Sequence, residues 1–102
     1  MNKKYSITYL PLFYKDMDKI TTYISKTLKN KTAANNLINE IQQKIEKRSY
    51  TPNSYEIYPS ISKKHQYYRI YVKNYIVFYI VKDNVMEVRR ILYNKRDFNN
   101  LI

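Results

Sequence analysis

Hydrophobic and polar residues alternate near the start of the chain. In residues 4–10 the apolar side chains are Tyr5, Ile7 and Tyr9, and polar residues stand between them. A period of two predicts a β-strand. Pro11 ends that strand, because proline has no N–H for a ladder hydrogen bond.

The period changes from Leu12 onward, where apolar residues recur every three or four positions and predict an amphipathic helix. The polar segment 28–32 predicts a turn, and a second helical stripe follows it and ends near Arg48. Two such helices with a short connection predict an antiparallel helical hairpin. The two stripes consist of Phe13, Met17, Ile20, Ile24 and Leu28, and of Ala34, Leu37, Ile38, Ile41 and Ile45.

Three β-rich segments close the chain, at residues 66–72, 75–81 and 85–93, after a loop at 55–65. The links between them have two and three residues, which predicts an antiparallel meander. The sequence has no glycine, so we expect Asn and Asp to supply the turn positions with positive φ. The element order is β-α-α-β-β-β. We therefore predict one α+β domain, residues 1–102, in which the N-terminal strand and the helical hairpin pack on an antiparallel sheet.

The charge balance is the strongest compositional feature. Nineteen Lys and Arg residues stand against eight Asp and Glu, which gives a net charge of +11. Such a field attracts nucleic acid, an anionic membrane surface or an acidic protein, although a generally lysine-rich composition explains it as well. The apolar runs are too short to cross a bilayer and the N-terminus lacks a signal-peptide pattern. We expect a soluble, cytoplasmic protein.

The sequence contains few residues that fit known catalytic motifs. The chain has no cysteine and no HExxH or glycine-dependent motif, and we expect no metal and no cofactor. Asp16 and Asp18 are two positions apart on a helix, so they do not form a catalytic pair. The single histidine, His65, is either a general acid or base or a solvated surface residue.

Basic residues concentrate in the predicted meander. Strand alternation places Tyr67, Arg69 and Tyr71 on one side of their strand. It also places Glu87, Arg89, Ile91 and Tyr93 on one side of the last strand and Met86, Val88, Arg90 and Leu92 on the other. Arginines between exposed tyrosines suit single-stranded nucleic acid, because guanidinium groups hold phosphates and phenol rings stack on bases. The same residues also make ordinary cross-strand pairs. The basic residues of this region are Lys63, Lys64, Arg69, Lys73, Lys82, Arg89, Arg90, Lys95 and Arg96.

Five ordered segments of the chain resemble those of one protein family. They are the opening YSITYLP, then DMDKITTYI, then AANNLINEIQQKIEK followed by TP, and finally YRIYVKNYIVFYIV and VMEVRRILYNKRD. The ordered set resembles toxins of the RelE/ParE superfamily, from bacterial type II toxin-antitoxin systems, over nearly the whole length.

The resemblance implies a growth-inhibiting toxin that a cognate acidic antitoxin protein neutralises. RelE-like members are metal-independent endoribonucleases that cut mRNA on the ribosome, whereas ParE-like members share the fold and poison DNA gyrase. We expect a ribosome-dependent mRNA endoribonuclease. The alternatives are a gyrase inhibitor without nuclease activity and an inactive basic nucleic-acid-binding module.

The resemblance also assigns candidate residues. Arg69 and Arg96 match basic positions that serve catalysis in RelE-like nucleases, and Tyr93 or Tyr71 would take the stacking or proton-transfer role. Ile76 departs from the nuclease pattern, because it stands where those enzymes carry a catalytic arginine. The long helical hairpin is more ParE-like, and Arg90, which matches the family's strand arginine, can be structural. Candidate nucleic-acid-binding residues are Lys63, Lys64, His65, Arg89 and Lys95.

Overall fold

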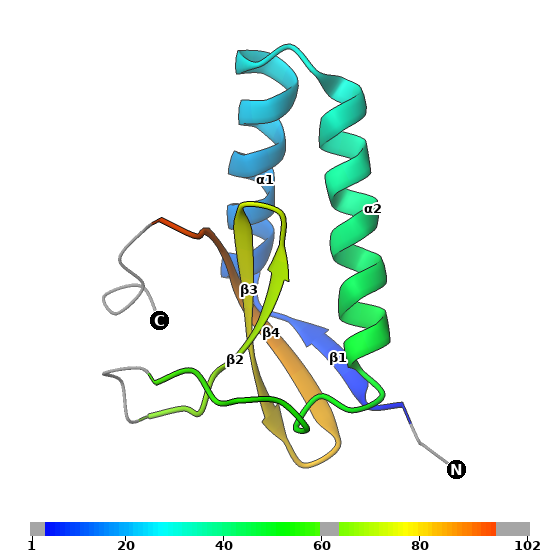
Figure 1. Ribbon diagram of the computed structural model, residues 1–102, viewed down its shortest axis with the longest axis vertical. Coiled ribbons are helices and arrows are strands. Elements are labelled where there is room, and N and C mark those ends of the chain that lie inside the picture. The colour runs from blue at the N-terminus through cyan, green and yellow to red at the C-terminus, as the bar shows by residue number, and fades with distance from the viewer. Residues whose placement is uncertain (1–3, 60–63, 96–102) are drawn as a thin grey trace.

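The computed structural model describes residues 4–59 and 64–95 and has two layers, a helical hairpin and a four-stranded sheet (Figure 1). No helix within those ranges combines the length and the apolarity that a membrane crossing needs. The elements in chain order are β1 (Ser6–Tyr9), α1 (Pro11–Thr22), the π-helical turn η1 (Tyr23–Thr27), α2 (Lys31–Arg48), β2 (Tyr68–Val72), β3 (Tyr75–Lys82) and β4 (Val85–Tyr93).

The strands lie in the order β1-β4-β3-β2. The strands β2, β3 and β4 form the predicted antiparallel meander. β1 joins the far edge of that meander and pairs in parallel with β4, which makes the sheet mixed. Parallel pairing requires a long crossover, and the helical hairpin provides it. The predicted α+β class and element order are therefore confirmed, and the N-terminal strand belongs to the sheet itself.

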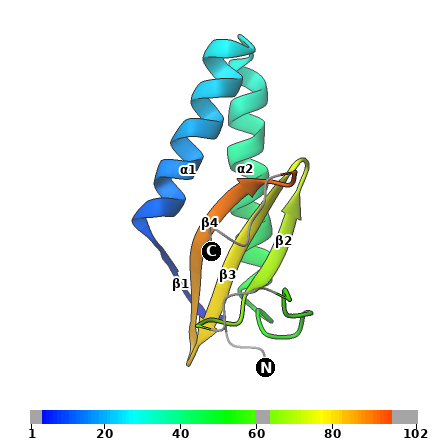
Figure 2. The ribbon, with the colours of Figure 1, turned by 90° about the vertical axis from the view of Figure 1, so that its left-hand side faces the viewer.

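Local sequence signals explain both helix starts. Pro11 occupies the first turn of α1, where its missing N–H costs no hydrogen bond. Asn30 caps α2, and its side-chain oxygen accepts a hydrogen bond of 2.9 Å from the N–H of Ala33. The tip of the hairpin projects beyond the sheet in both side views (Figure 2). Leu28, the last residue of the first predicted stripe, lies at this tip and stays 56% exposed.

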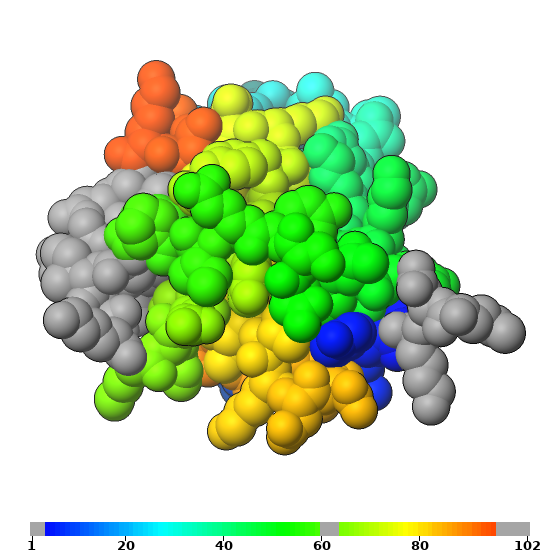
Figure 3. All heavy atoms as spheres, turned by 60° about the horizontal axis from the view of Figure 1, so that its bottom comes forward, coloured from blue at the N-terminus to red at the C-terminus, as the bar shows by residue number. Residues whose placement is uncertain are grey.

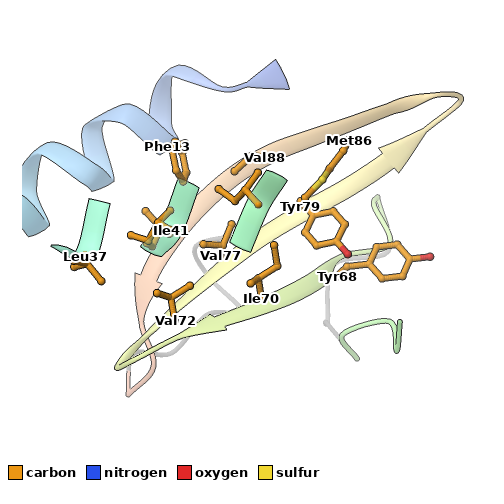
Figure 4. Packing of buried hydrophobic residues seen from close by; sticks show 12 residues of the cluster. Phe13, Leu37, Ile41, Tyr68, Ile70, Val72, Val77, Tyr79, Met86 and Val88 are labelled. Carbon is orange, nitrogen blue, oxygen red and sulfur yellow. The ribbon is translucent and has the colours of Figure 1, made fainter. Parts of the chain in front are cut away.

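The main core lies between the hairpin and one face of the sheet, as Figure 4 shows. Three α2 residues of the predicted stripe, Leu37, Ile41 and Ile45, are buried against the strands. The rings of Tyr68 and Tyr79 stack with their centroids 5.3 Å apart. Other members of this core include Phe13, Ile70, Val72, Val77, Met86, Val88 and Ile91.

Backbone positions with positive φ are taken by Lys29, Lys73 and Asp83. The prediction that Asn and Asp supply them is correct for Asp83 and wrong for the two lysines. Lys73 opens the turn between β2 and β3, Lys29 lies in the link between η1 and α2, and each is followed by an asparagine. The left-handed conformation is unfavourable for a residue with a Cβ atom, so these two turns carry some strain.

A β-bulge changes the predicted faces of β4. The ladder pairs Phe78 with Arg90 but Tyr79 with Val88, so Arg89 is an extra residue. Alternation shifts by one position after this point. Ile91 therefore joins Met86 and Val88 in the main core, while Leu92 packs on the other face. The predicted arrangement, in which Ile91 shares a side with Glu87 and Arg89, is wrong for this reason.

Candidate functional site

The face of the sheet turned away from the helices, called the far face below, has its own apolar cluster. Tyr67, Ile76, Phe78, Ile80 and Leu92 are buried there, and Tyr58, from the segment after α2, packs against them. Figure 3 shows this segment, in green, running across the yellow strand atoms. Tyr67 is only 2% exposed, so it offers no ring for base stacking. The expected bare surface of arginines and tyrosines is therefore present only at the rim of this face.

Arg69 and Tyr71 lie together at that rim, on β2. The guanidinium carbon of Arg69 is 4.9 Å from the ring centroid of Tyr58 and 5.8 Å from that of Tyr71. Both distances are within the range of cation–π attraction. Tyr71 is 55% exposed. Two of the predicted catalytic residues are thus neighbours.

Arg48 ties the end of α2 to the sheet and to the following segment. One of its Nη atoms donates hydrogen bonds of 2.9 Å to the carbonyl of Arg69 and to the hydroxyl of Tyr79. The Tyr79 hydroxyl donates in turn to the carbonyl of Pro52 at 2.6 Å. Burial raises the pKa of the Tyr79 phenol, and the hydrogen bond from Arg48 acts in the opposite direction.

Arg90 reaches α1 and forms an ion pair with Asp16. Its Nε and one Nη atom donate to the two carboxylate oxygens at 2.7 and 2.9 Å, and the N–H of Ile91 donates to the same carboxylate at 3.2 Å. The hydrogen bond to Asp16 raises the pKa of Arg90. A sequence signal for this pair exists, because Asp16 falls on the helix face of Phe13, Met17 and Ile20. An acidic residue on the helix face that packs against the core needs a hydrogen-bonding or charged partner there.

A group of polar residues lies at the end of the sheet that holds the β3–β4 turn. Lys64, His65, Glu87 and Arg89 line one hollow, together with Lys82. Arg89 is paired with Glu87, and the His65 ring lies edge-on to Tyr67 with centroids 5.9 Å apart. Lys95 follows β4 and is exposed. Lys63 and Arg96 lie outside the described residues.

Tyr93 lies on the helix side of the sheet, away from Arg69 and Tyr71. Its ring meets that of Tyr75 edge-on with centroids 6.0 Å apart. Burial raises the pKa of the Tyr75 phenol, and the nearby phenols of Tyr93 and Tyr23 act in the same direction. The three rings border an apolar groove, called the tyrosine groove below. It is lined by Lys19, Ile20, Tyr23, Ile24, Leu28, Ala33, Leu37, Lys73, Asn74, Tyr75 and Tyr93.

The described part of the chain holds no cluster of three or more His, Cys, Asp or Glu residues placed to bind a metal ion. Its acidic side chains are spread over separate elements. Asp16 and Glu87 each have an arginine partner. The chemistry that this part of the chain offers is hydrogen bonding by arginine and tyrosine at the rim of the far face.

The fold, a helical hairpin packed on one face of a mixed four-stranded sheet, is that of a small α+β protein. The solved chromosomal ParDE TA system from P. aeruginosa has the same fold, with a TM-score of 0.72 at 16% sequence identity, over 88% of this chain and 96% of that one. A family model described as "ParE toxin of type II toxin-antitoxin system, parDE" matches residues 7–98. The chain therefore belongs to the ParE toxin family, within the RelE/ParE superfamily that its sequence resembles.

A second solved structure, the RelB-RelE antitoxin-toxin complex from Methanococcus jannaschii, matches with 28% identity over 86% of this chain and 91% of that one, at a TM-score of 0.46. No curated protein sequence matches the chain.

Proposed function

We propose that this toxin arrests growth by binding DNA gyrase, that it does not cut mRNA, and that a cognate antitoxin neutralises it. The observation that carries the proposal is the dispersal of the residues expected to cleave RNA. Tyr93 lies on the opposite side of the sheet from Arg69 and Tyr71. Ile76, where RelE-like nucleases carry an arginine, is 4% exposed within the far-face cluster.

Metal-free cleavage of a phosphodiester needs several cationic groups that converge on one phosphate. Arg90 is held by Asp16 and Arg89 by Glu87, so neither guanidinium carries an uncompensated charge. Among the described arginines this leaves Arg48, which donates to two uncharged oxygens, and Arg69 beside Tyr71. A toxin that acts by binding a protein needs no convergent cationic site. The dispersed arginines therefore suit protein binding better than RNA cleavage.

The endoribonuclease remains the second candidate. It is favoured by the proximity of Arg69 and Tyr71, which could hold a phosphate and a base. Its other arginine, Arg96, lies outside the described residues. Both targets are cytoplasmic, so we propose the cytoplasm as the location for either activity.

The antitoxin is proposed to place an acidic amphipathic segment in the tyrosine groove. The groove is lined by the apolar residues Ile20, Ile24 and Leu37 and by two lysines, Lys19 and Lys73, of which Lys73 also faces Glu40 at 3.9 Å. Residues 19–39 contain no Asp or Glu. An apolar floor with a basic rim complements a helix or strand that carries acidic residues beside apolar anchors.

Inducible expression with two readouts tests the proposed target. Cells are induced, and the incorporation of labelled thymidine and of labelled leucine is followed over the first minutes. We expect DNA synthesis to stop first, because gyrase acts ahead of replication, while protein synthesis continues. An early loss of protein synthesis with continued DNA synthesis would instead support the endoribonuclease, and normal growth would remove both.

A further inference from the structure

Arg69 differs from the other arginines of the described chain in its hydrogen bonding. Arg48 donates to two oxygens, Arg89 is paired with Glu87, and Arg90 is paired with Asp16. Arg69 is bonded to no acceptor in residues 4–59 and 64–95, although it is only partly exposed. Its guanidinium N–H groups therefore remain available to a partner.

The position of this guanidinium is nevertheless fixed. Tyr58 and Tyr71 border it at 4.9 and 5.8 Å. Tyr58 is itself held, because its N–H donates a hydrogen bond of 2.6 Å to the carbonyl of Tyr67. The carbonyl of Arg69 accepts from Arg48, which anchors the backbone of this position. An arginine ordered before binding loses less side-chain entropy when a partner arrives.

The positive charge beside β2 is partly compensated by an acid of α2. Lys44 of α2 and Lys73 of the β2–β3 turn both face Glu40, at 3.5 and 3.9 Å. Lys44 also donates to the carbonyl of Tyr71. Nucleic-acid binding depends on several unneutralised cations in a row, and Glu40 offsets one of the two positive charges of Lys44 and Lys73. An exposed aromatic ring stands beside Arg69 instead, at Tyr71, which is 55% exposed.

We propose that Arg69, flanked by Tyr58 and Tyr71, grips one carboxylate on the surface of the target protein. The planar fork matches a carboxylate through two parallel hydrogen bonds. Arginine and tyrosine together are the residues that most often dominate the energy of a protein interface. This inference rests on the proposed function, because it assumes that the target is a protein, and it names the residue and the chemistry of that contact.

Arg69→Lys is the decisive variant, because it keeps the charge and removes the planar fork. It is compared with Arg69→Gln, with Tyr71→Leu and with the control Lys47→Gln, an exposed α2 position. Binding of each purified protein to immobilised gyrase is measured, and thermal unfolding confirms that each is folded. We expect Arg69→Lys and Arg69→Gln to weaken binding by roughly 30-fold, as a dominant interface residue does, and Lys47→Gln by less than about twofold.

Binding of Arg69→Lys at wild-type strength would overturn the inference, because a point charge would then suffice. The same variants are also titrated with a labelled single-stranded RNA. A loss of RNA binding that is specific to the Arg69 variants, with gyrase binding unchanged, would overturn the inference in favour of a phosphate contact.

Failure of the proposed function gives a different pattern, in which the wild-type protein arrests growth but does not bind gyrase. In that case the role of Arg69 is tested by whether each variant still arrests growth. Relief of arrest by Arg69→Lys, with RNA binding unchanged, supports a carboxylate contact with another protein. Full arrest by Arg69→Lys contradicts it.

Discussion

Arg89 and Arg90 are adjacent in the sequence, but their side chains reach different acids. Arg90 pairs with Asp16 on α1, and Arg89 pairs with Glu87 two residues earlier on the same strand. The side chains of Arg90 and Asp16 are 16% and 9% exposed, whereas those of Arg89 and Glu87 are 23% and 28% exposed. The Arg90–Asp16 pair is therefore the more buried of the two. Removal of one partner would leave the other charge buried without it.

Asp16→Ala tests that role. The substitution leaves the Arg90 guanidinium and the Ile91 N–H without this carboxylate, so we expect the free energy of unfolding to fall by about 3–5 kcal/mol. Chemical denaturation measures the change. Asp18→Ala, an exposed acid one half-turn further along, is the matched control and should change stability by at most about 0.5 kcal/mol. Equal effects of the two substitutions would contradict the structural role.

Tyr79 should make stability depend on alkaline pH. Burial raises the phenol pKa of Tyr79, and also that of Tyr9 and Tyr75. The unfolded chain loses these protons near pH 10 while the folded state keeps them to higher pH, so the folded state binds more protons there. The free energy of unfolding is then fully maintained below pH 10 and decreases as the pH rises above it.

Tyr79→Phe separates this residue from the other two phenols. We expect a loss of about 1–2 kcal/mol at neutral pH, because the carbonyl of Pro52 loses its donor and Arg48 loses one acceptor. The decline above pH 10 should also become shallower. Denaturation followed at pH 8 to 11 measures both effects, and an unchanged alkaline slope would count against the buried phenol.

At the scale of elements, Lys29 and Lys73 lie at positive φ in two of the links between elements. Lys73, between β2 and β3, has φ of 53°. Glycine adopts this region without a Cβ penalty. We expect Lys73→Gly to raise the free energy of unfolding by about 0.5 kcal/mol, after allowing for the greater freedom of glycine in the unfolded chain.

Lys82→Gly is the matched comparison, because Lys82 closes β3 in an extended backbone. There glycine should destabilise by about 0.5–1 kcal/mol. Thermal unfolding of both variants measures the difference. If Lys73→Gly lowered the melting temperature as much as Lys82→Gly, the turn would carry no strain.

The helices, the strands and their order could be predicted from local periodicity. Both helical stripes and all three strands of the meander match the observed elements within a few residues. The bulge at Arg89 could not be predicted, because one inserted residue leaves the apolar pattern of VMEVRRILY, residues 85–93, ambiguous. That single residue moves Tyr93 to the helix side, away from Arg69. The Asp16–Arg90 pair links residues 74 positions apart, and neither local pattern specifies the other partner.

At the scale of the whole molecule, the distribution of charge over the surface matters more than the net charge. The net charge is +11, but several cations of the described sheet and of α2 have acidic partners. Lysines 19, 26, 29 and 31 lie on the projecting hairpin in a stretch without acids. The field of the molecule should therefore be strong along the hairpin, which borders the tyrosine groove where the antitoxin is proposed to bind.

Salt should weaken the complex with the antitoxin. Charge-driven association slows as ionic strength rises, because exposed charges are screened. We expect the association rate constant to fall by at least about tenfold between 0.05 and 0.5 M NaCl. The double variant Lys19→Glu, Lys73→Glu should already lower this rate constant at low salt. Surface plasmon resonance with the purified antitoxin measures both. A salt-independent rate would exclude charge as the driving force.

The toxin is proposed to act on gyrase by protein contact. DNA supercoiling by purified gyrase, with increasing amounts of the wild-type toxin, tests it most directly. We expect supercoiling to stop and cleaved DNA to accumulate, in the absence of ribosomes and of mRNA. Unimpaired supercoiling, together with cut mRNA when the same protein is added to a translation reaction, would contradict it.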